Sequence, residues 1–388
     1  MKYKTMWGLP LLLSAFGYQA SWADPVQLKE IEVKGESLDE ANSAFTVNVV
    51  DNETLRGVHL DQPLRFLEQV PGLYLGAYRQ GGVADVFVIR GFAGAGHGGD
   101  AAVYVDGIPL NEGMSHSDGY ADTNVLIPIE IQKAAIYKGP VSPLYGNFAR
   151  GGTLAFTTRK GGEYQELDFA VGPWATYDVQ AALGGRFGAL DTNFALEAYH
   201  TDGWRENSGY DKSNAAARIS YNLSDRSEIS LSLRQHGGQW DAPGYQPQDQ
   251  FDDDERRKLQ AVNAENDGGR KRFTTQRIDF SQLLSDDVKL LVFAYGTKMD
   301  WTRWAKFGYT AGGQREDNYD RPVFGLGASL NGKKSIAGYA ANWVAGVEYY
   351  SEDTTWERWS SANRVRQSLD VDRDFTINTA SLLSLIHI

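Results

Sequence analysis

The feature that most constrains this chain is the alternation of apolar and polar side chains after residue 162. Within Glu228–Arg234 every second residue is apolar, and Tyr339–Tyr349 repeats the pattern over a longer stretch. A period of two places successive side chains on opposite faces of a strand. The region is therefore predicted to be an antiparallel β-sheet, in which we count about ten strands.

The connections between these strands alternate in length. Short turns are predicted at Gly188–Leu190, Ser224–Arg226, Ser285–Asp286 and Asn331–Lys334, and longer loops at Gly203–Lys212, Gly237–Arg270, Ala305–Asp320 and Thr354–Asp370. Soluble sandwiches also alternate, so the period alone does not distinguish water from lipid around the sheet. A sheet whose strands are joined by short turns at one end and by long loops at the other is typical of an outer-membrane barrel.

The first part of the chain has a different character. Val86–Lys160 places short β-branched runs between glycine-rich turns, and Phe45–Val50 reads as a further strand. Asp61–Val70 is predicted to be a helix, because its apolar residues share one face and Pro71-Gly72 would stop it. We therefore expect a small mixed α/β domain at residues 37–162, ahead of the β-rich region at 163–388.

The N-terminus has the pattern of a secretory signal peptide. Lys2 and Lys4 precede an apolar run at Leu9–Phe16, and Ser21-Trp22-Ala23 provides a small-x-small cleavage site. A membrane-spanning helix needs about 20 apolar residues, and this run is shorter. Residues 1–23 are predicted to be a signal peptide, and residues 24–36 a polar arm.

Several short motifs appear in a fixed order in the first domain. They are Ile89-Arg90-Gly91-Phe92, Tyr104-Val105-Asp106-Gly107-Ile108-Pro109-Leu110, Lys138-Gly139-Pro140, Leu144-Tyr145-Gly146 and Gly151-Gly152. This series resembles the plug domain of TonB-dependent outer-membrane receptors. The resemblance implies a plug followed by an antiparallel transmembrane β-barrel in the outer membrane of a Gram-negative bacterium. It implies uptake of a scarce extracellular ligand, with no enzymatic activity.

The resemblance also assigns expected roles to individual residues. Glu30, Ile31, Glu32 and Val33 would form the TonB box, which pairs with a TonB-type energy-transducing protein in the periplasm. Arg90 and Arg150 would lock the plug to barrel carboxylates. The candidate ligand contacts are Phe92, His97, Met114, His116 and Tyr120. A ferric siderophore is the first choice of ligand, and cobalamin, haem and a carbohydrate remain open.

Composition and motifs exclude several other functions. The net charge of −12 argues against nucleic acid as a partner, and without cysteine there is no disulfide framework. Gly94–Gly99 matches GxGxxG but leads into a predicted strand, so no dinucleotide cofactor is expected. The acidic run at Asp252–Lys258 lacks the ligand spacing of an EF-hand, and no metal site is predicted.

Other functions considered for the whole protein are a passive porin or adhesin and a secreted hydrolase. A passive porin or adhesin would not need the plug or the arm, and a secreted hydrolase would need a catalytic motif such as GxSxG.

Plugged transporters have about 22 strands, so about ten strands make an incomplete barrel, and we expect a longer protein. Leu382–Ile388 departs from the alternation, which suggests a tail that is not native. Aromatic residues near the strand ends could form an interfacial girdle or line a ligand vestibule.

Overall fold

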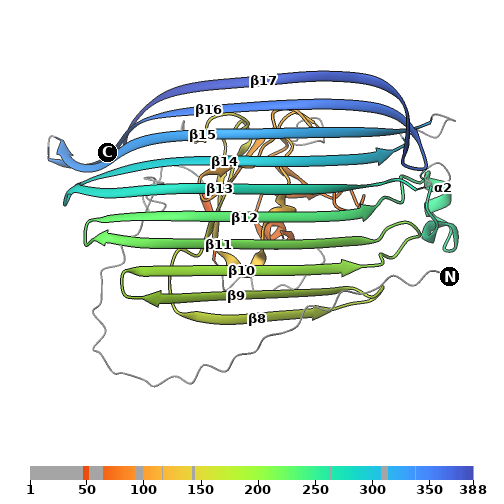
Figure 1. The fold of residues 1–388 in the computed structure, drawn as a ribbon, viewed down its shortest axis with the longest axis horizontal. Coiled ribbons are helices and arrows are strands. Elements are labelled where there is room, and N and C mark those ends of the chain that lie inside the picture. The colour runs from red at the N-terminus through yellow and green to blue at the C-terminus, as the bar shows by residue number, and fades with distance from the viewer. Residues whose placement is uncertain are drawn as a thin grey trace. The chain divides into compact units, whose positions relative to one another are not determined.

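The computed structural model describes residues 47–51, 64–92, 99–115, 117–141, 145–261, 264, 266–306, 313–336 and 338–387. The signal peptide and arm predicted at residues 1–36 lie outside these ranges. The described residues form a small mixed domain, here called the plug, and a ten-stranded antiparallel sheet, here called the wall (Figure 1). This arrangement confirms the predicted fold class. No helix in the described ranges has the length and apolarity to cross a membrane.

The plug is built on a five-stranded sheet in the order β1-β6-β7-β4-β5, with a separate hairpin of β2 and β3. The strands are β1 Val47–Asp51, β2 Leu73–Gly76, β3 Val86–Ile89, β4 Ala101–Val105, β5 Ile108–Pro109, β6 Ile131–Lys138 and β7 Gly152–Thr158. Short 3₁₀ helices occupy Thr123–Val125 and Pro128–Glu130. Strands β4 and β7 pair in parallel, and their apolar side chains form the centre of the core.

The predicted helix at Asp61–Val70 is shorter and tighter than expected. The structure has a 3₁₀ helix at Arg65–Gln69, and Asp61 lies outside the described residues. Its N-cap residue, Leu64, offers no side-chain hydrogen bond, and Pro71-Gly72 follows directly. A segment confined between these boundaries has room for about one turn, the length at which 3₁₀ geometry is common.

The wall runs in sequence order from β8 to β17. Its strands are β8 Tyr164–Val171, β9 Tyr177–Phe187, β10 Leu190–Thr201, β11 Tyr210–Ser224, β12 Ser227–Asp241, β13 Gly268–Ser285, β14 Val288–Ala305, β15 Gln314–Ile336, β16 Tyr339–Ala362 and β17 Val365–His387. A short helix, α2 Gln248–Phe251, and a 3₁₀ helix at Arg256–Lys258 lie in the connection from β12 to β13. Among the described strands β8 and β17 are the edges, so the sheet is an incomplete barrel.

Two predicted connections, at Asn331–Lys334 and Thr354–Asp370, are wrong. β15 continues through Asn331–Lys334, and β16 continues to Ala362, where Asn363 and Arg364 make a tight turn with φ of 50° and 62°. Positive φ at both central residues is the geometry of a type I′ hairpin. β17 likewise continues to His387. Leu382–Ile386 departs from the alternation, yet its backbone stays paired with Trp343–Val347 of β16.

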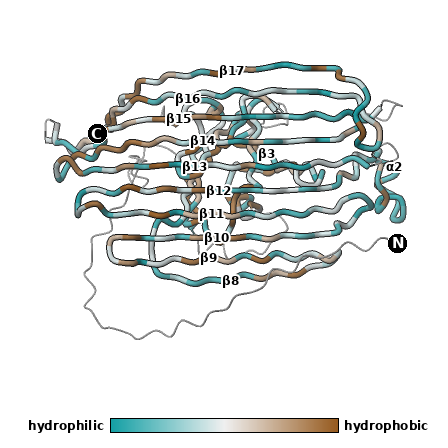
Figure 2. The backbone as a smooth tube through the Cα atoms, in the orientation of Figure 1, coloured by the Kyte–Doolittle hydropathy of each residue, from teal (hydrophilic) through white to brown (hydrophobic). Residues whose placement is uncertain are grey.

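The burial pattern of the wall is the reverse of that in a soluble sheet. On β10, Phe194 and Leu196 are 44% and 58% exposed, whereas Asn193 and Glu197 on either side of them are buried. The same arrangement holds on β12, where Leu231 is exposed and Ser230 is buried. In Figure 2 apolar residues recur along the wall strands, and the segment around α2 is hydrophilic. An apolar outer face with a polar inner face suits a sheet surrounded by lipid.

Candidate functional site

A cavity of about 250 Å³ lies between a plug loop and the inner face of the wall. The loop connects β5 to the 3₁₀ helix at Thr123–Val125, and the wall residues belong to β14, β15 and β16 at the end that carries α2. The lining residues are Met114, Ser115, Ser117, Asp118, Trp301, Arg303, Arg315, Asp317, Tyr319, Trp356 and Arg358. We call this cavity the chamber.

Strand register places the wall side chains of the chamber in two rows. Trp301 is paired with Tyr319, and Tyr319 with Trp356, which gives one aromatic row across three strands. The ring centroids are 5.7 Å apart between Trp301 and Tyr319 and 6.3 Å apart between Tyr319 and Trp356. Two residues further along, Arg303 is paired with Asp317 and Asp317 with Arg358.

The second row is dominated by arginine. The buried Asp317 carboxylate lies 3.0 Å from Nε of Arg315 and 2.7 Å from Nε of Arg358, and it also accepts a hydrogen bond from Trp356 Nε1 at 3.0 Å. Two guanidinium groups therefore share one carboxylate. The Arg358 guanidinium also lies 4.7 Å from the centroid of the Trp356 ring, within the range of a cation–π contact.

Lys271 on β13 connects the aromatic row to the plug. Its Nζ lies 2.7 Å from Glu112 Oε1 and 3.0 Å from Asp122 Oδ2, and its side chain is 1% exposed. The same ammonium is 4.5 Å from the Trp301 ring centroid, and Tyr120 of the plug stacks on Trp301 at 5.5 Å. One wall cation is thus held by two plug carboxylates and an aromatic face.

A second buried pair holds the base of the chamber loop. Arg321 Nη2 donates to Glu352 Oε2 at 2.8 Å and to the Asn111 carbonyl oxygen at 3.1 Å. The Gly113 amide donates to Glu352 Oε1 at 3.1 Å. The Asn111 side chain in turn bonds to the backbone of β4 and to the Gly119 carbonyl, so both ends of the loop are fixed.

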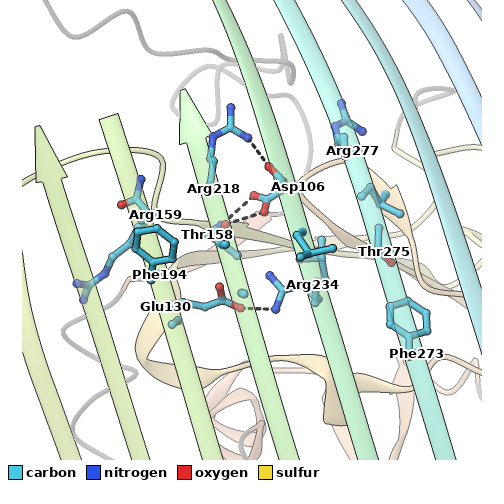
Figure 3. A pocket seen from close by; sticks show the side chains of 18 of the residues that line it. Asp106, Glu130, Thr158, Arg159, Phe194, Arg218, Arg234, Phe273, Thr275 and Arg277 are labelled. Carbon is cyan, nitrogen blue, oxygen red and sulfur yellow. Dashed lines mark hydrogen bonds and ion pairs between the residues drawn. The ribbon is translucent and has the colours of Figure 1, made fainter. Parts of the chain in front are cut away.

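A smaller cavity of about 50 Å³ lies between the plug and strands β10 to β13 (Figure 3). Asp106 accepts hydrogen bonds from Thr158 N at 2.9 Å and Thr158 Oγ1 at 2.6 Å, and Glu130 forms an ion pair with Arg234. Burial raises the pKa of Glu130 above its ordinary value although Arg234 opposes the shift. This cavity has room for little more than water, and beside it the Glu130–Arg234 ion pair joins the plug to the wall.

The buried carboxylates predict a dependence of plug docking on pH. Burial opposes the charge on Asp122, but Lys271, His236 and the hydrogen bonds to Asp122 outweigh it and lower its pKa. Its stabilising contribution is present above the unfolded value of about 3.9 and is lost as pH falls through the lower folded value. We therefore expect Asp122→Asn to flatten the stability profile below about pH 4.

Thermal unfolding of the wild type and the variant between pH 3 and 7 measures this effect. Glu130→Gln is the matched comparison with the opposite sign, because the raised pKa of Glu130 gives a contribution that is lost as pH rises. An acid-side slope that is unchanged in Asp122→Asn would contradict the assignment.

The structure brings together only part of the predicted site. Met114 lines the chamber. Tyr120 is buried behind it, and its hydroxyl accepts a hydrogen bond from the Ala84 amide at 2.8 Å. Phe92 lies elsewhere in the plug beside Gly151 and is half-exposed. His97 and His116 lie outside the described residues.

Arg90 and Arg150 are the two arginines expected to lock the plug to the wall. Their described contacts are with other residues of the plug. Arg90 Nη1 donates to the Lys138 carbonyl oxygen at 3.4 Å, and Arg150 forms an ion pair with Asp100. Both arginines are largely exposed. Their locking role stays a prediction.

Sequence reasoning missed the basic residues of the chamber. Trp301 and Arg303, Arg315 and Asp317, and Trp356 and Arg358 are each two residues apart, so each pair shares one strand face. That spacing was a usable signal, but only the register shows that the three pairs face one space. Of the aromatic residues near the strand ends, Trp301 and Trp356 line the chamber and Tyr349 is exposed, and their roles as vestibule or girdle stay predictions.

Comparison with known proteins finds a family model and a curated relative that are similar to part of this chain. Residues 39–153 match the family model described as the TonB-dependent receptor plug domain. The ferrichrome outer membrane transporter/phage receptor of Escherichia coli K12 is 32% identical over 94 residues, which is 24% of this chain and 12% of that protein.

Solved structures match over most of the chain. The unliganded ferric citrate transporter FecA has a TM-score of 0.71 at 15% identity, and the match covers 89% of this chain and 54% of that one. The siderophore receptor PiuA of Acinetobacter baumannii has a TM-score of 0.63 at 17% identity, covering 88% and 55%. FpvA of P. aeruginosa, bound to a pyoverdine–iron complex, has a TM-score of 0.68 at 13% identity, covering 89% and 49%. The chain spans about half the length of these structures.

Proposed function

Because the chain belongs to the TonB-dependent receptors, with their plug domain at residues 39–153 and the fold of their barrel after it, we propose that it serves energised uptake of a scarce ligand, a ferric siderophore in the first instance. The proposed location is the outer membrane of a Gram-negative bacterium. The family consists of receptors and transporters, and no catalytic role is proposed. Cobalamin, haem and a carbohydrate are the alternative ligands.

The observation that carries this proposal is the chamber. It is closed on one side by a plug loop and on the other by the wall, so a ligand bound there would touch both parts at once. Such a position suits a receptor in which occupancy of the site must be sensed by the plug. The exposed apolar face of the wall supports placement in lipid.

The proposed mechanism uses force rather than bond chemistry. Lys271 and Arg321 hold the plug against the wall through buried ion pairs and hydrogen bonds, so a passage requires that these contacts be broken. Glu30–Val33 of the arm would pair as a strand with the TonB-type protein, which pulls on the plug. Arg90 and Arg150 stay proposed as further locking residues.

A proline in the TonB box tests the energised mechanism. Ile31→Pro removes a backbone N–H donor and restricts the strand conformation, so uptake should fall by at least about tenfold while ligand binding is unchanged. Ile31→Val keeps the strand donor and is the matched control. Uptake and binding of a ⁵⁵Fe-labelled siderophore by cells expressing the full-length gene product measure the two steps separately. Wild-type uptake by Ile31→Pro would favour a passive porin.

A further inference from the structure

Two arginines of β13 face away from the plug. Arg270 and Arg272 lie on the same side of the strand as Ile278, which is 47% exposed. Lys271, between them, points the other way and is buried against the plug. Both arginines are exposed, and they lie toward the end of the wall that carries α2 (Figure 1). They therefore belong to the outer face of the wall, outside any path through the barrel.

The arginines begin where the apolar part of the outer face ends. Strand register places Arg272 in one row of outward residues with Ala198 of β10. The adjacent row toward the short turns contains Leu196, which is 58% exposed. On β13 itself, Ile278 is the last apolar outward residue before the arginines. Because barrel strands are tilted, a row crosses the membrane boundary obliquely, and the arginines lie on its polar side.

Neither arginine forms an ion pair within the described part of the chain. The contact of Arg270 is with the Trp304 ring, whose centroid lies 5.7 Å from the guanidinium carbon. On β12 the residues opposite the two arginines are Gln239 and Gly237, which carry no charge. An anion that approaches from the side of β12 therefore meets two guanidinium groups and no carboxylate of that strand.

The nearest acidic residue on the other side already has a lysine partner. Asp300 of β14 lies opposite Arg272 in the register, and its ion pair is with Lys298 at 3.8 Å. Lys298 also pairs with Asp320 of β15. These three residues form a mixed cluster, so they do not supply the arginines with a counter-charge of their own.

Further along the outer face the charge becomes negative. Asp353 of β16 lies on the side of the exposed Val347, and Asp374 of β17 is paired with Thr355. The Asp353 carboxylate accepts a hydrogen bond from Thr376 at 2.7 Å, and the Asp374 carboxylate accepts one from Thr355 at 2.7 Å. A phosphate would be repelled from these strands, so a phosphate-bearing headgroup is restricted to the neighbourhood of β12 and β13.

We propose that Arg270 and Arg272 bind the phosphate groups of a lipid headgroup in the outer leaflet. The planar guanidinium fork matches a phosphate with two hydrogen bonds. The two Cα positions are about 7 Å apart, so the arginines can share one phosphate or hold two phosphates of one headgroup. Trp304 beside Arg270 is the kind of amphipathic ring that is enriched at membrane interfaces. This inference goes beyond ligand uptake and rests on the proposed outer-membrane location.

Binding of lipopolysaccharide, a phosphate-bearing lipid of the outer leaflet, tests the inference. The full-length gene product is purified in a nonionic detergent, freed of lipid and titrated with lipopolysaccharide before and after its phosphates are removed by a phosphatase. We expect removal of the phosphates to weaken binding by at least about tenfold, and the affinity of the intact lipid to fall as salt increases. Inorganic phosphate is titrated as a competitor, because it carries the same charged group without the lipid.

Variants then connect binding to the two arginines. The double variant Arg270→Gln, Arg272→Gln should weaken binding of intact lipopolysaccharide by at least about tenfold. Replacement of both by lysine keeps the charge but loses the fork, so it should weaken binding less. The matched control is Arg256→Gln with Arg257→Gln, which removes two exposed arginines from the connection between β12 and β13 at the same end of the wall. Thermal unfolding in the same detergent shows whether each variant is folded.

Each outcome supports or overturns the site. Equal weakening by the two glutamine pairs would reduce the effect to overall charge and overturn the inference. Binding that survives removal of the phosphates would overturn it as well. If inorganic phosphate competes as tightly as lipopolysaccharide binds, the arginines hold free phosphate and the lipid assignment fails.

The proposed function is tested separately by uptake. A protein that binds lipopolysaccharide through these arginines but takes up no siderophore would overturn the proposed function and leave the lipid site standing. A full-length gene product that fractionates outside the outer membrane would overturn the location and the inference together.

Discussion

Replacing Lys271 with methionine is expected to weaken the attachment of the plug to the wall by about 3–5 kcal/mol, because two buried carboxylates would lose their shared cation. Glu112 and Asp122 are both buried, and neither can regain water without movement of the plug. Hydrogen exchange of plug residues 111–125 should rise, and cells should admit antibiotics that are too large for porins.

A matched substitution on the neighbouring strand controls for loss of a lysine. Lys298 on β14 pairs with Asp320, and both side chains are about half-exposed, so Lys298→Met should change stability by less than about 1 kcal/mol. Adding Glu112→Gln and Asp122→Asn to Lys271→Met removes the unpaired charges and should restore much of the protection. Equal effects of Lys271→Met and Lys298→Met would rule out Lys271 as a plug anchor.

Gly152→Ala is expected to destabilise the plug by about 3 kcal/mol or more, since it combines backbone strain with a steric clash. Gly152 has φ of +152°, and a Cβ there would lie 2.2 Å from the Tyr137 carbonyl oxygen. That oxygen belongs to β6, the strand paired with β7. The variant should reach the outer membrane in reduced amount, and amides of β6 and β7 should lose protection from hydrogen exchange.

Comparison of Gly139→Ala with Gly152→Ala separates the cost of backbone strain from the cost of the steric clash. Gly139 has φ of +100°, but within the described residues no atom other than those of its chain neighbours lies within 4 Å of the position its Cβ would take. This variant should cost only the backbone term, about 1–2 kcal/mol. If both alanine variants behave alike, close approach of Tyr137 to Gly152 is not what requires glycine.

These two glycines show how much of the plug could be predicted from the sequence. Lys138-Gly139-Pro140 and Gly151-Gly152 were recognisable from their order along the chain, and that order was enough to predict the plug. Their physical reasons differ, however, because one glycine permits a turn and the other permits contact between two strands. Only coordinates distinguish these cases.

The chamber marks the limit of sequence reasoning more clearly. Alternation predicted the wall strands but not which residues on different strands would meet, because register depends on turns, and the predicted loop at Thr354–Asp370 was wrong. Once β16 runs to Ala362, Arg358 lies opposite Asp317. Two described ion pairs between plug and wall run opposite to the expected direction, since Lys271 and Arg234 of the wall meet carboxylates of the plug. A third has the expected direction but uses another arginine, because Arg159 of the plug pairs with Glu166 of β8 at 2.7 Å.

The reversed polarity of the wall has a consequence for how such a protein can change over time. Lipid has no fixed shape, so outward residues such as Phe194 and Leu231 can be exchanged for other apolar residues independently. The inward cations Lys271 and Arg234 face particular plug carboxylates, and a change on one side leaves a buried charge alone until the other side changes too. The plug and its wall are therefore inherited as a matched pair, and a plug transplanted from a relative would need its carboxylates at 112, 122 and 130 to fit this wall.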